Sequence, residues 1–146
     1  MQVLCSHIND PQQNRWTHSP PGASTIGDEM TVGQENGMER KAWMIRLNAE
    51  KVEEYKQLHA NAWPTIRDQI SACNIRNYSI FLREPENLLV GIYEYYGDDL
   101  DADMKRMGED ADTRKWWALT DPCQTPLESA DEGEWWVPME EVFHLD

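Results

Sequence analysis

Residues 75–95 read IRNYSIFLREPENLLVGIYEY, two β-rich runs separated by a short polar segment. The runs Ile75–Leu82 and Leu88–Tyr95 are dominated by branched and aromatic residues, which suit a pleated and half-buried surface. The segment between them, Arg83–Asn87, contains Pro85 and has the length of a hairpin loop. The sequence therefore predicts a β-hairpin here.

The segment before the hairpin predicts a strand followed by two short helices. Lys41–Leu47 suits a strand, and Asn48 is a good N-cap for the helix that follows it. Proline lacks an amide hydrogen, so Trp63-Pro64 interrupts this helix and starts a second one, Pro64–Ala72. The first helix carries one stripe of residues at helical spacing: Val52, Tyr55, His59 and Ala62.

The segment after the hairpin predicts two more helices and a last strand. An amphipathic helix runs from Asp98 to about Met107, and a shorter one covers Thr113–Leu119. Residues 124–138 have the composition of a loop, and Glu140–Leu145 suits a strand. The element order is then βα, ββ, αβ.

This order predicts an α+β protein of the ferredoxin-like βαββαβ plan. Short connections join antiparallel strands and helical crossovers bring the chain back, so the sheet is antiparallel and its helices lie on one face. The other face would be exposed unless a second copy covered it. We therefore expect a homodimer of the dimeric α+β barrel type.

Two segments of different composition divide the chain. Residues 1–37 are rich in proline and glycine and have almost no apolar periodicity, so they cannot bury enough surface to offset the entropy of ordering. We predict a disordered extension over residues 1–37 and one α+β domain over residues 38–146. Met38 stands directly before the patterned region, and a rival hypothesis makes it the natural start.

The composition excludes several classes of partner. The 146 residues carry a formal net charge of −14, which repels nucleic-acid backbones and anionic lipid. No run of about 18 apolar residues could span a membrane, and the first residues lack the apolar core of a secretory signal. The three cysteines are far apart and form no C-x-x-C pair. We expect a cytoplasmic protein with reduced thiols and with neither a nucleic-acid nor a membrane partner.

Tyr55 and His59 form the first candidate site. They stand four residues apart on the predicted helix, so their rings project from one face and could converge on a small ligand. An imidazole titrates near neutrality and can both accept and donate a proton. The alternative is a histidine packed in the core with its nitrogens bonded to the backbone.

Further aromatic residues add to this candidate site. Trp116 and Trp117 point about 100° apart on a helix, so at least one should face a groove or a partner instead of the core. Tyr78 lies in mid-strand, and its hydroxyl could bond a ligand or merely a backbone carbonyl. Trp135-Trp136 occupies a loop, where a lid over the core or over a dimer seam is the stronger interpretation.

Metal and cofactor motifs find no support in the sequence. The four histidines are scattered, and neither H-x-x-x-H nor H-E-x-x-H occurs. The acidic clusters match no EF-hand loop and suit solvated faces and helix caps. There is also no glycine-rich phosphate loop. We expect neither a metal nor a cofactor.

Six short motifs follow one another along the chain with consistent gaps: Arg40-Lys41-Ala42-Trp43, Tyr55-x3-His59-x3-Trp63-Pro64, Asn77-Tyr78-Ser79-Ile80, Asn87-Leu88-Leu89, Trp116-Trp117 before Thr120-Asp121, and Glu141-Val142-Phe143. Together they resemble the L-rhamnose mutarotase family from about Met38 to the C-terminus. The resemblance implies a dimeric ferredoxin-like fold and the cofactor-free interconversion of the α and β anomers of a free 6-deoxy-hexose, L-rhamnose or L-fucose.

By matching position, the resemblance makes His59 the acid/base residue and makes Tyr55, Tyr78, Trp116 and Trp117 substrate contacts. In the corresponding hypothesis His59 donates a proton to the ring oxygen and recovers one on closure, while Tyr55 or Tyr78 orients the anomeric hydroxyl. Two alternatives of other classes are a cofactor-free monooxygenase of the same fold type and a non-catalytic sugar-binding module.

Overall fold

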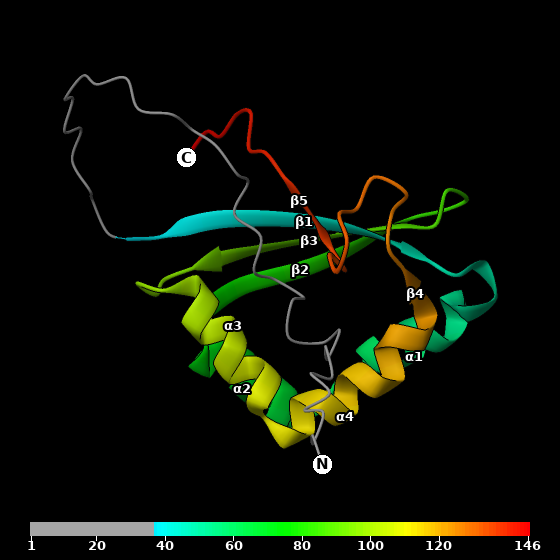
Figure 1. Ribbon diagram of the computed structural model, residues 1–146, viewed down its shortest axis with the longest axis horizontal. Helices are drawn as coiled ribbons and strands as arrows, with labels where there is room; N and C mark the ends of the chain where they lie inside the picture. The colour runs from blue at the N-terminus through cyan, green and yellow to red at the C-terminus, as the bar shows by residue number, and fades with distance from the viewer. Residues whose placement is uncertain (1–36) are drawn as a thin grey trace, which may run out of the picture.

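The computed structural model describes residues 37–146, which form one sheet with four α-helices on one side of it (Figure 1). The predicted disordered extension therefore lies outside the described residues, except for Gly37 at its end. None of the helices that the structure describes combines the length and the apolar character that crossing a membrane requires.

The sheet has the predicted ferredoxin-like order. Its central strands follow one another as β2-β3-β1, all antiparallel, and the free side of β1 is shared by β4 and β5. The predicted strand and hairpin at residues 41–95 are confirmed, and the predicted single strand beside β1 is replaced by two short ones. The strands are β1 (Glu39–Leu47), β2 (Ile75–Arg83), β3 (Leu88–Tyr95), β4 (Gln124–Thr125) and β5 (Val137–Met139).

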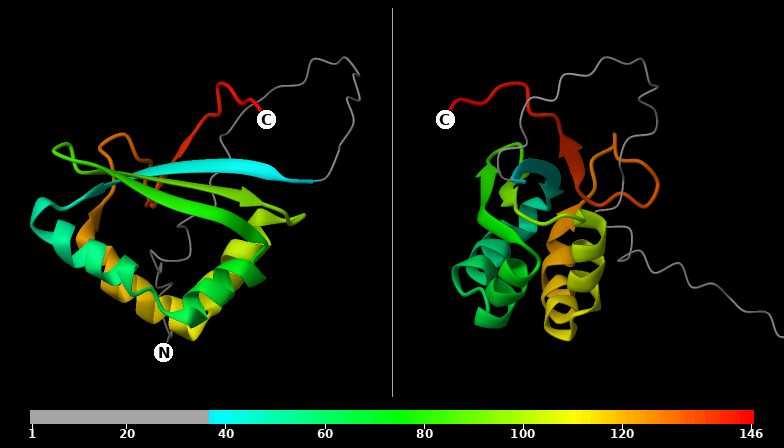
Figure 2. Two further views of the ribbon diagram at one scale, coloured as in Figure 1. Left: turned by 180° about the vertical axis from the view of Figure 1, so that it is seen from behind. Right: turned by 90° about the vertical axis from the view of Figure 1, so that its left-hand side faces the viewer.

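The helices lie as two neighbouring pairs beneath the sheet, α1 with α2 and α3 with α4 (Figure 2). Pro64 stands at the first position of α2, as predicted, because a missing amide hydrogen costs nothing there. Asp99 and Asp110 cap α3 and α4 by accepting from backbone amides of the first turn. The helices are α1 (Val52–Ala60), α2 (Pro64–Ala72), α3 (Leu100–Glu109) and α4 (Ala111–Thr120).

Asn48 does not cap a helix with its side chain, and that prediction was wrong. A single 3₁₀ turn, Ala49–Lys51, separates it from α1. Its amide nitrogen instead donates to the carbonyl of Pro122 at 3.1 Å, and its side-chain oxygen accepts from the hydroxyl of Thr125 at 2.6 Å. These bonds tie the start of α1 to the segment that forms β4.

The predicted last strand, Glu140–Leu145, was also wrong. Pairing with β1 ends at Met139, opposite Ala42, and the chain beyond it has no regular structure. Its branched and aromatic residues favour a strand, but a strand needs a partner edge, and the chain leaves β1 after three paired residues. The loop predicted at residues 124–138 correspondingly contains β4 and the start of β5.

A bulge in β2 turns Tyr78 toward the helices. The register with β3 shifts between Arg76 and Ser79, and Asn77 between them has a positive φ of 51°, which asparagine tolerates better than most residues. Tyr78 is half-buried on the helix-covered face, with Ile80 and Leu82 following at alternate positions. The bulge therefore places the side chain of Tyr78 in the interior between the sheet and the helices.

Candidate active site

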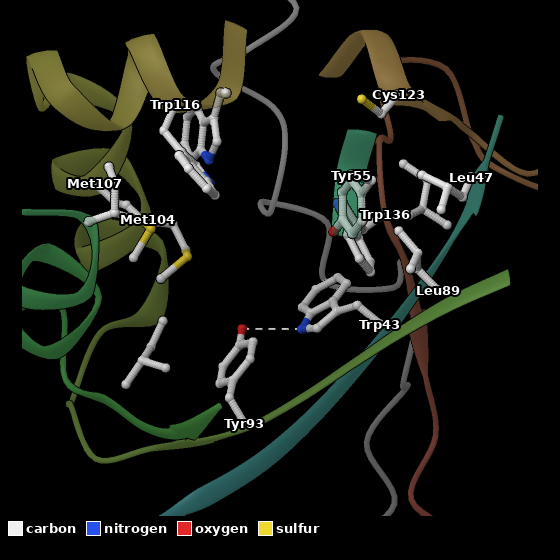
Figure 3. Close-up of a cluster of buried hydrophobic side chains, with 14 of the residues drawn as sticks. Trp43, Leu47, Tyr55, Leu89, Tyr93, Met104, Met107, Trp116, Cys123 and Trp136 are labelled. Atoms are coloured by element: carbon white, nitrogen blue, oxygen red, sulfur yellow. Dashed lines mark hydrogen bonds between the residues drawn. The ribbon is translucent and has the colours of Figure 1, made fainter. Parts of the chain in front are cut away.

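All five site residues expected from the sequence line one small chamber between the sheet and the helices. Its volume is about 60 Å³, and α1, α4 and β2 each contribute part of its wall. Figure 3 shows Tyr55, Trp116 and Trp136 pointing from different elements into the same interior. The complete lining is Tyr55, His59, Tyr78, Ile80, Trp116, Trp117, Thr120, Gln124 and Trp136.

The backbone of α1 determines which nitrogen of His59 carries the proton. Nδ1 lies 3.0 Å from the carbonyl oxygen of Tyr55, one turn earlier. A carbonyl only accepts, so Nδ1 is the protonated nitrogen and Nε2 of the neutral ring is the basic one. Burial lowers the pKa of His59 below its ordinary value, and the bond to Tyr55 opposes this only in part. His59 is therefore a neutral proton acceptor at physiological pH.

Aromatic rings hold the imidazole in place. The ring of Tyr55 lies 4.1 Å from that of His59 between centroids, tilted by 31°. Trp116 presents its indole edge-on at 5.4 Å, and Trp63 packs edge-on against Trp116 at 5.5 Å. Because Tyr55 and Trp116 are both buried, the imidazole keeps one orientation relative to the chamber.

Trp116 and Trp117 are both buried and both line the chamber. Both also belong to the hydrophobic core, so the expectation that at least one of them faces a groove or a partner instead of the core was wrong. Tyr78 also reaches the chamber, although its phenol packs edge-on against that of Tyr93, with ring centroids 5.6 Å apart.

Four residues of the chamber were missed by sequence reasoning as site residues: Ile80, Thr120, Gln124 and Trp136. Gln124 and Thr120 are buried polar residues near the end of α4, and Trp136 was interpreted as part of a lid. Trp136 instead packs within the interior, close to Gly91 on β3. A Cβ at Gly91 would make ordinary van der Waals contacts, 3.5 Å from the indole of Trp136 and 3.4 Å from the ring of Tyr78. The adjacent tryptophans at positions 135 and 136 were the one sequence feature that could have indicated a further site residue.

A larger apolar chamber adjoins the small one and shares His59, Tyr78 and the two tryptophans of α4 with it. Its volume of about 310 Å³ is at the lower end of the range for small-molecule sites. Tyr93 forms part of its wall, and the indole of Trp43 donates to the Tyr93 hydroxyl at 3.1 Å (Figure 3). Burial raises the pKa of Tyr93, which keeps this phenol protonated. The remaining apolar lining includes Ile66, Ile70, Ile75, Met104 and Met107.

The combined site pairs a polar end with an apolar end. Polar groups of His59, Tyr55 and Gln124 gather in the small chamber, whereas isoleucine and methionine side chains dominate the large one. Such a site suits a small neutral molecule with hydroxyls on one side and C–H groups on the other. Within residues 37–146, no three His, Cys, Asp or Glu side chains come together in a way that could hold a metal ion.

Comparison with known proteins gives consistent similarities. Residues 40–145 match the model of a family described as L-rhamnose mutarotase. Curated relatives named L-rhamnose mutarotase include one from Oceanobacillus iheyensis, 28% identical over 109 residues, and one from Lachnoclostridium phytofermentans, 33% identical over 118 residues. Each match covers 75% of this chain and 100% of the relative.

The fold is similar to that of a solved structure as well. The crystal structure of L-rhamnose mutarotase from Formosa agariphila aligns with a TM-score of 0.58 and 24% sequence identity. The alignment covers 74% of this chain and 99% of that one. At this level of identity the structural likeness shows only the fold, and it is the sequence matches that show the relationship to the family.

Proposed function

Since the chain belongs to the L-rhamnose mutarotase family, we propose that its two adjoining chambers are the site at which the α and β anomers of free L-rhamnose interconvert. Family membership makes the protein an isomerase that acts on a carbohydrate. The observation that carries the proposal for the site is the neutral His59, which presents Nε2 among aromatic walls.

His59 moves the proton in this proposal. Its Nε2 accepts the proton of the anomeric hydroxyl as the bond between C1 and the ring oxygen breaks and the aldehyde forms. The electron pair of the broken bond goes to the ring oxygen, which takes the proton from the imidazolium. Rotation about the C1–C2 bond and closure by the reverse steps give the other anomer. The neutral tautomer thus makes His59 accept first, the reverse of the order expected from the sequence.

The other predicted site residues orient the sugar. The phenols of Tyr55 and Tyr78 hydrogen-bond its hydroxyl and ring oxygens, and Trp116 and Trp117 cover its C–H face. The apolar chamber takes the C6 methyl group, because a 6-deoxy sugar has no hydroxyl there that would need a partner. This arrangement favours a free sugar over a phosphorylated one, as does the net charge of −14.

The proposed activity is tested by saturation transfer between the anomeric protons of L-rhamnose, measured by NMR with and without the protein. We expect faster exchange with L-rhamnose than with L-fucose at equal concentration. The proposal fails if the folded protein does not accelerate the exchange of L-rhamnose.

The acid limb of the pH profile reports His59. Burial places its pKa below the ordinary value of 6.5, so more than half of the imidazole is still neutral, and active as a base, at pH 6.5. We therefore expect kcat/KM to fall on the acid side with its half-maximal point below pH 6.5. An NMR titration of the imidazole should give the same pKa as the rate profile, after subtraction of uncatalysed exchange. A half-maximal rate at or above pH 6.5 would contradict this assignment.

A homodimer through the uncovered face of the sheet also belongs to the proposal. Residues on this face are apolar at several neighbouring positions, and Phe81 is 59% exposed. Met44 and Val90 are direct cross-strand neighbours there, and Val90 also faces Phe81. Val142 and Phe143, which follow β5 in the chain, also have exposed side chains. A two-fold axis would bring the same patch of a second copy against this one.

We expect Phe81→Glu to separate the copies. Because the interface is self-complementary, the substitution places two buried carboxylates in it and should weaken association by about 30-fold or more. Light scattering after size exclusion measures the mass in solution. Leu119→Glu, at an exposed leucine of α4, is the matched control and should leave the mass unchanged. A wild-type mass of one chain would refute the dimer.

A cytoplasmic location remains a proposal too. It is supported by Cys73 and Cys123, which are both buried free thiols. Reduced cysteines are typical of cytoplasmic proteins. Fractionation of the producing cells tests it.

A further inference from the structure

Gln124 connects two parts of the site that are distant in the sequence. It is the first residue of β4 and is 6% exposed. The indole nitrogen of Trp135 donates to its side-chain oxygen at 3.0 Å, and its amide nitrogen donates to the hydroxyl of Tyr55 at 3.4 Å. A chain of hydrogen bonds therefore runs from Trp135 through Gln124 to Tyr55.

The chemistry of the indole sets the direction of this chain. An indole N–H can only donate, so the carboxamide of Gln124 must present its oxygen to Trp135. The amino group then faces Tyr55, and the phenol oxygen accepts from it. A phenol that accepts this bond directs its own proton to a different acceptor. The direction of the Tyr55 hydroxyl is thus determined by Trp135, to which it is connected through two successive hydrogen bonds.

We infer that Gln124, held by Trp135, is a positioning residue that makes Tyr55 a hydrogen-bond donor to the sugar during ring opening. The inference rests on the proposed function, because it needs a sugar oxygen in the small chamber. When the bond between C1 and the ring oxygen breaks, negative charge develops on the ring oxygen until it takes the proton from His59. A phenol aimed at that oxygen stabilises the charge at the moment it appears.

The position of Gln124 explains why the orientation matters. Gln124 and His59 line the same small chamber, and both contact Tyr55. Gln124 donates to its hydroxyl, and the imidazole of His59 lies against its ring. A carboxylate in place of the amide would accept from both neighbours. It would keep the bond from Trp135, but it would draw the proton of Tyr55 away from the sugar.

Three variants separate positioning from packing. Gln124→Glu reverses the bond to Tyr55 while retaining the one from Trp135, Gln124→Met removes both at nearly constant shape, and Trp135→Phe removes only the orienting N–H. Gln57→Glu, on the exposed side of α1, adds the same charge outside the chamber and serves as the control. Exchange of L-rhamnose is measured at pH 8, where the introduced carboxylate is ionised.

We expect Gln124→Glu and Gln124→Met to lower kcat tenfold or more with KM changed less than threefold. Trp135→Phe should lower kcat several-fold. The double variant Gln124→Met/Trp135→Phe should be no slower than Gln124→Met alone, because Trp135 acts through Gln124. Gln57→Glu should behave as the wild type.

The inference is overturned if Gln124→Glu keeps the wild-type kcat, or if the losses from Gln124→Met and Trp135→Phe multiply in the double variant. Thermal melting of each variant shows whether a loss of rate is a loss of folded protein. A wild-type protein that exchanges no sugar would overturn the proposed function itself, which is a different result from active wild type with unaffected variants.

Discussion

Replacing His59 with glutamine is expected to lower the kcat of anomer exchange by about 10²- to 10⁴-fold, the range that general acid–base help usually supplies. The amide of glutamine can occupy the place of the Nε2 edge, but it cannot take up a proton and return it. Tyr55 and Trp116, which contact the imidazole, would keep the walls of the chamber. L-rhamnose should therefore still bind, with a KM close to that of the wild type.

A binding measurement and a control variant make this result decisive. Quenching of tryptophan fluorescence by L-rhamnose reports binding, because Trp116 and Trp117 line the chamber. Lys115→Gln is the control, since Lys115 precedes Trp116 on α4 and its side chain is 69% exposed. If the folded His59→Gln protein exchanged anomers at the wild-type rate, His59 would have no catalytic role. If the wild type and His59→Gln both bound L-rhamnose and neither exchanged its anomers, the result would favour a non-catalytic sugar-binding module.

The central elements of the fold were predictable because each is specified locally. Branched and aromatic residues in Ile75–Leu82 and Leu88–Tyr95 indicate two strands, and Pro64 determines where α2 begins. The strands after α4 could not be predicted, because their pairing depends on an edge of β1 that two short strands share. The branched and aromatic residues of Glu140–Leu145 favour a strand but give no information about which sheet edge is available to it.

The site shows the same division. Tyr55 and His59 could be placed together because helical spacing is a local rule, and the structure has their ring centroids 4.1 Å apart. Gln124 is 69 residues from Tyr55, and no spacing relates the two. Its neighbourhood follows from the bonds of Asn48 to Pro122 and Thr125, which exist only in the folded chain.

Gly97→Ala is expected to destabilise the fold by about 2 to 5 kcal/mol, although it adds one methyl group. A Cβ at this position would lie 2.7 Å from Oδ2 of Asp103 and closer still to the phenol of Tyr95. Neither group can move freely. Both residues are buried, and the Tyr95 hydroxyl donates to Asp103 at 2.7 Å. The methyl group must therefore separate a charge-assisted bond or displace the backbone.

The carboxylate of Asp103 joins three elements, which enlarges the effect of Gly97→Ala. It accepts from Asn74 at 2.8 Å and from Arg106 at 2.7 Å, in addition to Tyr95. These bonds connect the end of α2 and the end of β3 to α3, which supplies two methionines to the large chamber. Chemical denaturation measures the free energy of unfolding, and a loss below about 1 kcal/mol would contradict the predicted clash.

Two further variants test the cause of this loss. Gly108→Ala, inside α3, adds the same methyl group where the nearest atom of Trp117 is 3.6 Å away, so it should stabilise by up to about 1 kcal/mol through helix propensity. Tyr95→Phe alone should destabilise, because Asp103 loses a donor. In the Gly97→Ala background the same change removes the clashing hydroxyl, so it should recover part of the stability. If Tyr95→Phe lowers stability when residue 97 is glycine and raises it when residue 97 is alanine, contact with the phenol is the origin of the effect. Loss of backbone freedom at residue 97 cannot reverse the sign of the Tyr95→Phe effect.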